Sequence, residues 1–221
     1  GTAFFQAYTS CQPEHGVGDD MSTAQAQRAR DSRLLPEFTF NPGRGETYQE
    51  AVDVKGNPQA DRDWWETTLK STGEKVRYTI AHYAVTEARF RQHLKKVKEE
   101  AVGNLVPLDN LLTLISQDDV VRRHVFDPAH RAYVPDFGAY IRAEDNDGQA
   151  GWYAVSRQLV LLCVERRKAW RLLQSKAGVI NKEYRAQRAL LARLNKGELA
   201  REDLLNGGAG LVKEETLKLT A

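Results

Sequence analysis

The sequence has few cysteines, a single methionine and no long apolar run. Two cysteines, Cys11 and Cys163, are too few for the disulfide framework of a small secreted domain. We therefore expect a reducing compartment. The longest apolar run covers only the six residues 159–164, far fewer than the roughly 20 that cross a bilayer. The sequence thus predicts no transmembrane segment.

The first residues also lack the features of a secretory signal. The pair Phe4–Phe5 is too short to form a hydrophobic region, and no Lys or Arg precedes Arg28. The one methionine is Met21, away from the start. We expect the first residues to be either the end left after removal of a transit peptide or a cloning scar. Removal of a transit peptide would indicate a mitochondrial protein, in the matrix or on the matrix side of the inner membrane.

The pattern shows no long alternation of apolar and polar residues, which is the mark of half-buried strands. The 221 residues are 41% hydrophobic and 28% charged, which suits one or two folded domains with a buried core. The sequence therefore predicts an all-α fold, an irregular bundle of helical hairpins. We expect an extended N-terminal arm over 1–57, a helical domain over 58–205 and a mobile C-terminal tail over 206–221.

Start and stop signals divide the helical domain. Pro58 suits the first turn of a helix, and Ser71 with Glu74 forms a capping-box pattern before a second helix. Glycines and amides mark the ends of later helices. An acidic turn is expected at 144–148. Helices are expected at about 58–69, 71–102, 107–115, 118–125, 137–142, 149–176, 181–195 and 198–205.

The second of these helices has the clearest apolar pattern. Apolar residues recur at alternating spacings of four and three, interrupted only at Glu87. Such heptad spacing is typical of a helix that packs along a seam against another helix. The expected helix-packing seam consists of Val76, Ile80, Tyr83, Phe90, Leu94 and Val97.

The net charge of +2 conceals an uneven distribution. Between Arg157 and Arg201 there are twelve Lys and Arg and three Glu, which gives +9 and leaves −7 for the rest. Three interpretations of this basic helical hairpin are open: its cations face solvent, they pack on the acidic turn, or they contact an anionic partner. Arginine favours the last choice, because it recognises carboxylates and phosphates. The expected basic interaction face consists of Arg166, Arg167, Arg171, Arg185, Arg188 and Arg193.

Part of the hairpin resembles the C-terminal helical hairpin of a small-subunit ribosomal protein. The likeness covers about 40 residues, including 165–173, Tyr184 and 190–194, with Ser156 and Arg157 before them. The gaps differ, and the His and Asp of that family are missing before Ser156. The resemblance implies an RNA-associated structural protein, such as a mitochondrial ribosomal subunit, as an alternative function.

Arg77 and His82 resemble the short Arg…His signature of helical HEPN-type ribonucleases. In that family the arginine holds a phosphate while the histidine acts as acid or base. Here Tyr78 stands where a small polar residue is usual. The offset of five also places the two side chains about 140° apart on a regular helix. The resemblance implies a ribonuclease as a further alternative.

Other patterns of catalytic or metal sites are missing. No two of the five histidines have the i, i+4 spacing of a helical metal site, and no Cys or His pair has zinc-site spacing. The glycines at 207–210 follow no expected strand, as a phosphate-binding loop would. His124 and His130 flank a polar turn that we interpret as ordinary surface. We therefore expect no cofactor, no metal and no catalytic residue.

The arm, the seam and the basic hairpin together predict a non-catalytic accessory subunit of a large assembly. An arm with little apolar surface gains contact area by lying on a neighbour. Our first hypothesis is a supernumerary structural subunit of a mitochondrial energy-converting complex, such as ATP synthase or a respiratory-chain complex. The basic face would contact other protein subunits or anionic lipid head groups, and RNA is the less favoured partner.

Overall fold

The computed structural model describes residues 3–115, 125–131 and 133–219. Its main sheet has four strands in the order β5-β8-β7-β6. The strands are β5 (Leu94–Val97), β6 (Val106–Pro107), β7 (Ala139–Glu144) and β8 (Ala150–Val155). The expected all-α bundle of helical hairpins is therefore wrong, because the fold combines helices with sheets.

Two smaller antiparallel sheets and a set of helices complete the fold. One sheet pairs β1 (Thr39–Phe40) with β2 (Val52–Asp53), and the other pairs β3 (Trp65–Thr68) with β4 (Lys75–Tyr78). The helices are α1 (Gln12–His15), α2 (Ser22–Asp31), α3 (Tyr48–Ala51), α4 (Ile80–Val85), α5 (Glu99–Val102), α6 (Leu108–Leu114), α8 (Arg157–Lys176), α9 (Lys182–Asn195) and α10 (Arg201–Lys218). Short 3₁₀ helices are η1 (Asp19–Met21), η2 (Pro42–Arg44) and η3 (Ala88–His93).

The β7–β8 hairpin replaces the helix expected at 137–142 and the start of the next one. The strands pair antiparallel along their whole length. The acidic turn lies between them as expected, with the Asp145 carboxylate accepting the N–H of Gln149 at 2.9 Å. Gly148 has a φ of +72°, which a glycine adopts readily. This turn chemistry joins two strands rather than two helices.

The six seam residues do not lie on one helix. Val76 is in β4, Ile80 and Tyr83 are in α4, Phe90 is in η3, and Leu94 and Val97 are in β5. The helix expected at 71–102 is wrong because α4 is only six residues long and is flanked by strands of four. Thr86 follows α4, and its hydroxyl donates to the Tyr83 carbonyl at 2.7 Å. The helix expected at 58–69 is likewise replaced by turns and β3.

Parts of residues 3–57 pack on the rest of the chain. Ala29 and Val54 are buried. The Gln25 amide donates to the Thr86 hydroxyl at 3.0 Å and to the buried Glu87 carboxylate at 3.1 Å. The expected arm is thus folded in part, with α1, α2 and α3 inside it.

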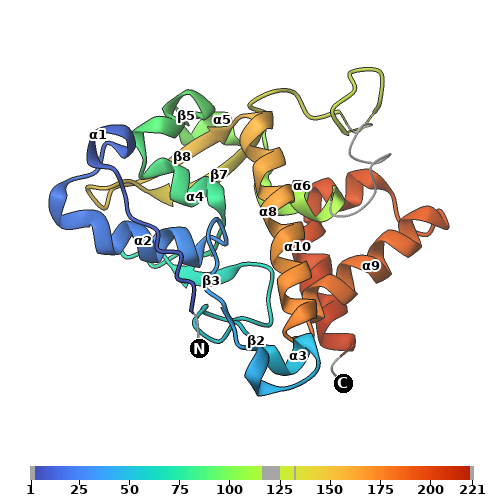
Figure 1. Cartoon of the computed structure of the whole chain (residues 1–221). Coiled ribbons are helices and arrows are strands. Elements are labelled where there is room, and N and C mark those ends of the chain that lie inside the picture. The colour runs from blue at the N-terminus through green and yellow to red at the C-terminus, as the bar shows by residue number, and fades with distance from the viewer. Residues whose placement is uncertain (1–2, 116–124, 132, 220–221) are drawn as a thin grey trace.

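The main core lies where α4 packs between β7 of the sheet and α8, which in turn packs against α6. Ile80 of α4, Leu159 and Cys163 of α8, and Ile141 of β7 are each at most 5% exposed. Burial of one such aliphatic side chain contributes roughly 1.5–3 kcal/mol. In Figure 1 the sheet lies to the left of α8, while α6, α9 and α10 lie to its right.

The C-terminal end of α8 and the start of α9 agree with the sequence signals. Gly178, with a φ of +69°, follows the last turn of α8, and the Asn181 side chain accepts the N–H of Tyr184 at 3.0 Å at the start of α9. The start of α8 is later than expected, because Ser156 caps it directly after β8. Among the described residues, no helix combines the length and apolar character that crossing a bilayer requires.

Residues 206–218, expected in a mobile tail, lie in α10. The Asn110 amide supports this glycine-rich segment: it donates to the Leu205 carbonyl and accepts the Ala209 N–H, both at 2.9 Å. A regular helix joins these two backbone groups to each other. A Cβ at Gly208 would lie 3.2 Å from the Thr113 Cβ, so glycine allows α10 to approach α6 closely. Tertiary contacts thus offset the poor helix propensity of glycine.

The expected helix at 107–115 is confirmed as α6. The helix expected at 118–125 falls mostly outside the described residues, as does His124. Of the polar turn that follows, His130 lies 3.6 Å from the Asp127 carboxylate.

Candidate basic surface and adjoining cavity

The six arginines of the expected basic face separate into two groups. Arg167 is 1% exposed, and the Arg171 side chain is 10% exposed. The other four are half-buried or exposed: Arg166, Arg185, Arg188 and Arg193. The expected face is therefore divided between an internal cluster around Asp63 and an outer surface on α9.

Asp63 is the centre of the internal cluster and is fully buried. Arg171 binds both carboxylate oxygens, donating from Nε to Oδ1 at 2.7 Å and from Nη2 to Oδ2. Asn181 donates to Oδ1 at 2.8 Å, and Gln187 donates to Oδ2 at 3.4 Å. These bonds join the loop before β3 to α8 and α9.

Burial and the neighbouring charges determine the pKa values of the cluster. Burial alone would raise the pKa of Asp63, but Arg171, with smaller effects of Arg167 and Arg77, holds it well below its usual range. Asp63 is therefore ionised. Burial lowers the pKa of Arg167 to about 9, and its Nη2 has no hydrogen-bond partner among the described residues. The cluster holds elements together and offers no exposed face to a partner.

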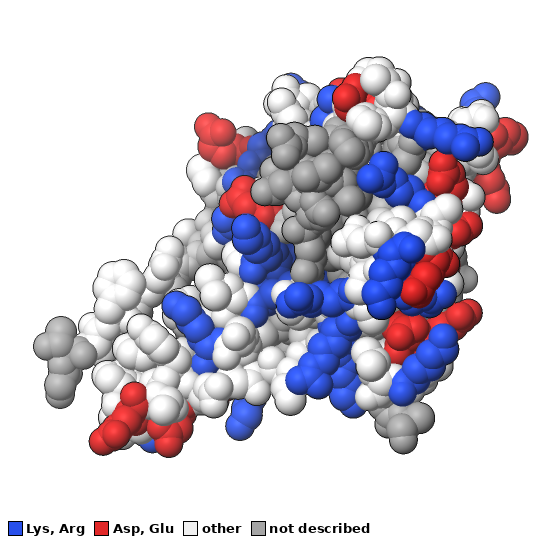
Figure 2. Space-filling model, turned by 90° about the vertical axis from the view of Figure 1, so that its right-hand side faces the viewer, with Lys and Arg blue, Asp and Glu red and all other residues white. Residues whose placement is uncertain are grey.

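The outer group forms what we call the α9 basic surface, which consists of Lys182, Arg185, Arg188 and Lys196. All four are exposed, and none has an ion pair within the described part of the chain. At 100° per residue they cover an arc of roughly 120° of the helix. No Asp or Glu is exposed on α9. Figure 2 shows Lys and Arg gathered across this side of the molecule, with Asp and Glu mainly toward its margins.

Arg166 and Arg193 differ from the α9 basic surface because each has an acidic neighbour. Arg166 donates to Glu165 at 2.6 Å, and Arg193 lies 3.9 Å from Glu215 and 4.0 Å from Glu198. Lys182 and Lys196, absent from the expected face, take their place. The helical spacing of the basic residues from Lys182 onward is the signal that could have found them.

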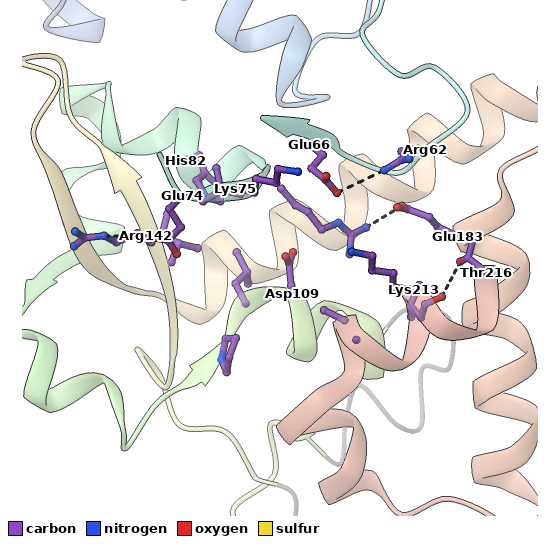
Figure 3. A pocket seen from close by; sticks show the side chains of 18 of the residues that line it. Arg62, Glu66, Glu74, Lys75, His82, Asp109, Arg142, Glu183, Lys213 and Thr216 are labelled. Atoms are coloured by element: carbon purple, nitrogen blue, oxygen red, sulfur yellow. Dashed lines mark hydrogen bonds and ion pairs between the residues drawn. The ribbon is translucent and has the colours of Figure 1, made fainter. Parts of the chain in front are cut away.

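A cavity of about 750 Å³ lies beside the start of α9 (Figure 3). Volumes of roughly 300–1,000 Å³ are usual for small-molecule sites. Its apolar lining includes Leu108, Ile141, Trp152 and Val212. Its charged lining consists of Arg62, Lys75, Arg77, Arg142, Lys182 and Lys213 and of Asp61, Glu66, Glu74, Asp109 and Glu183. Lys182 thus belongs both to the cavity and to the α9 basic surface.

Three ion pairs connect oppositely charged residues of the lining. They are Arg77–Glu183 at 2.9 Å, Arg62–Glu66 at 3.6 Å and Arg142–Glu74 at 3.7 Å. Arg77 is the innermost of these cations, and Glu183 with other carboxylates raises its pKa in spite of its burial. Its charge is therefore permanent.

Arg77 and His82, which resemble the ribonuclease signature, do not share a helix. Arg77 is in β4 and pairs with Glu183, while His82 is in α4. The Thr79 N–H donates to His82 Nδ1 at 3.1 Å, and the ring lies 5.5 Å from the Tyr78 ring. His82 is thus a buried residue that supports the start of α4.

We expect His82 to make the protein less stable toward acid. Burial lowers its pKa from 6.5 to about 4, so the unfolded chain binds a proton in this range that the folded protein does not. The free energy of unfolding should fall by up to about 3 kcal/mol as the pH decreases from 6.5 to 4. Urea unfolding at several pH values measures this. A His82→Asn variant should show a smaller fall, and an equal fall in both proteins would contradict the expectation.

A serine and a histidine also meet, at the start of α8. Ser156 Oγ lies 3.0 Å from His93 Nδ1, and Asp136 lines the same depression of about 520 Å³. Ser156 is 4% exposed and its hydroxyl accepts the Leu159 N–H. Its geometry is that of a helix cap, and the Asp136 carboxylate accepts the N–H of Arg157 at 2.7 Å. The group therefore stabilises the β8–α8 junction.

Within the described residues no group of three or more His, Cys, Asp and Glu side chains is placed to hold a metal ion. Cys11 is exposed, Cys163 is buried, and both are free. Comparisons with family models, with curated proteins and with solved structures each found no match.

Proposed function

We propose that this chain is a non-catalytic structural subunit of a hetero-oligomeric complex, and that its α9 basic surface contacts an acidic surface of a partner subunit. The observation that carries the proposal is the row of four exposed cations without ion partners among the described residues. An acidic partner would neutralise them, and such complementarity steers association and fixes its register.

Exposed aromatic residues near the start of the chain support a protein partner. Phe4 and Phe5 are each 89% exposed, and Phe38, Phe40 and Tyr48 are more than half exposed. Aromatic side chains are enriched at protein interfaces, and the Phe40 and Tyr48 rings lie 6.3 Å apart. The finer form of the proposal is a supernumerary subunit of a mitochondrial energy-converting complex.

An RNA-associated structural protein is the second candidate. The observation that favours it is the lack of any exposed carboxylate on α9. The negatively charged phosphate backbone attracts a surface that carries positive charge alone. The RNA would then contact Lys182, Arg185, Arg188 and Lys196 and not the buried Arg167 and Arg171.

Affinity capture of the tagged chain from its source tests the proposal. The Arg185→Glu/Arg188→Glu variant should lose at least about 90% of the stoichiometric partners, because two attractive contacts become repulsive. A Lys70→Glu/Lys98→Glu variant has the same change in charge at two exposed lysines elsewhere and should keep them.

The same capture separates the two candidates. Treatment with ribonuclease should leave the partners of the wild type in place if they are proteins bound directly. Loss of all partners after ribonuclease would favour RNA. Equal capture by both charge-reversal variants would exclude the α9 basic surface as the contact.

A further inference from the structure

The lining of the cavity beside α9 has six Lys and Arg and five Asp and Glu, and only part of this positive charge is held in ion pairs. Three of its cations are paired with Glu66, Glu74 and Glu183. The remaining cations are Lys75, Lys182 and Lys213, and no carboxylate of the described residues pairs with them. Three lysines around one opening can neutralise an anion that carries more than one charge.

The three lysines come from separate elements that meet at the cavity. Lys75 belongs to β4, Lys182 to α9 and Lys213 to α10. Figure 3 shows Lys75 and Lys213 extending toward the same space from opposite sides, and Arg77 also lines the cavity. A ligand that enters would contact cations on both sides and the Arg77 guanidinium deeper inside.

Asp109 supplies an acceptor within the same cavity. Its carboxylate receives no hydrogen bond from the described residues, and burial raises its pKa although Arg77 and Arg167 oppose this. Asp109 is half-buried and lines the cavity, so its carboxylate is open to a ligand hydroxyl that donates to it.

The floor of the cavity is apolar and partly aromatic. Trp152 lies 5.6 Å from the Tyr140 ring, both on the sheet, and Leu108 and Val212 are buried beside them. The Arg142 guanidinium lies 4.7 Å from the Trp152 ring. A bare inorganic anion would leave this floor uncovered, whereas an organic group would bury it.

We propose that the cavity binds an organic phosphate of nucleotide size that carries free hydroxyl groups. Lys75, Lys213 and Arg77 hold the phosphate, Asp109 accepts a hydroxyl, and the organic group covers the floor at Trp152. The proposal does not require the proposed function: the two sites share Lys182, but Arg185 and Arg188 do not line the cavity.

Isothermal titration calorimetry with adenosine 5′-monophosphate and ribose 5-phosphate tests the proposal. At least one should bind with a millimolar or lower Kd, and should bind at least tenfold more tightly than inorganic phosphate or adenosine. Lys75→Ala and Lys213→Ala should each weaken binding about tenfold. Asp109→Ala should bind adenosine 5′-monophosphate and its 2′,3′-dideoxy analogue equally, whereas the wild type should prefer the former.

Lys196→Ala is the matched control, because Lys196 is exposed directly after α9 and does not line the cavity. It should leave the Kd unchanged, as should Arg185→Glu/Arg188→Glu. Unfolding midpoints equal to that of the wild type show that the lysine variants are folded. Failure of both phosphates to bind would overturn the proposal. So would inorganic phosphate binding as tightly, or an equal effect of Lys196→Ala and Lys213→Ala.

Discussion

Replacing Asp63 by alanine should lower the free energy of unfolding by about 3–5 kcal/mol. The change removes the carboxylate that Arg171, Asn181 and Gln187 all contact. Arg171 would then be an uncompensated charge in a largely buried site, which is the costly outcome when one partner of a buried ion pair is lost. Urea unfolding followed by circular dichroism measures the effect.

Asp61→Ala is the matched control for this change. Asp61 lies two residues away, is exposed and has no ion pair among the described residues. Its removal should change the stability by no more than about 0.5 kcal/mol.

The stabilisation from Asp63 should also disappear as the pH falls below 3.8, the ordinary pKa of an aspartate, because folding lowers the pKa of Asp63. A loss below about 1 kcal/mol in Asp63→Ala would contradict the assigned role of the cluster.

Replacing Trp170 by alanine should cost about 3–5 kcal/mol. Trp170 is fully buried on α8, where it packs with Val52 and Val54. Its Nε1 donates to the Arg62 carbonyl at 2.7 Å, and the Arg33 guanidinium lies 4.3 Å from its ring. The change removes both the apolar contacts and the anchor of the N-terminal region on α8. Amide hydrogen exchange should therefore increase around residues 52–64 as the unfolding free energy falls.

Leu172 provides the control on the same helix, since it is 60% exposed. Leu172→Ala should change stability by less than about 1 kcal/mol and leave the exchange at 52–64 unaltered. If Trp170→Ala destabilised the protein without faster exchange in this segment, the anchoring role would be wrong.

Long amphipathic helices could be predicted from the sequence. The last part of α8, its stop at Gly178, the start of α9 after Asn181, and α6 all agree with the expected positions. In each of these the apolar period continues over two or more turns, or a capping residue marks the boundary. Local signals were sufficient there because tertiary contacts favour the same state.

The strands could not be recognised because they are short or rich in small residues. β4 and β5 have four residues each, too few to show a period of two. β7 does alternate in burial, but two of its inward residues are Ala139 and Ala143. β8 is almost continuously apolar and leads directly into α8, so the two were interpreted as one helix.

The candidate site was predictable only in part. Arg185 and Arg188 lie on the expected outer surface, whereas Arg167 and Arg171 are internal. Nothing in the local sequence distinguishes Asp63 from Asp61, because the partners of Asp63 are more than 100 residues away. The cavity likewise depends on β4, α9 and α10 meeting in three dimensions.

Native mass spectrometry of the endogenous chain, purified from its source at low salt, tests the central claim most directly. A structural subunit should appear within a hetero-oligomer and be released at high salt, since salt screens contacts of the α9 basic surface. We predict masses well above that of the free chain and their loss in Arg185→Glu/Arg188→Glu. A free monomer under the same conditions would contradict the account.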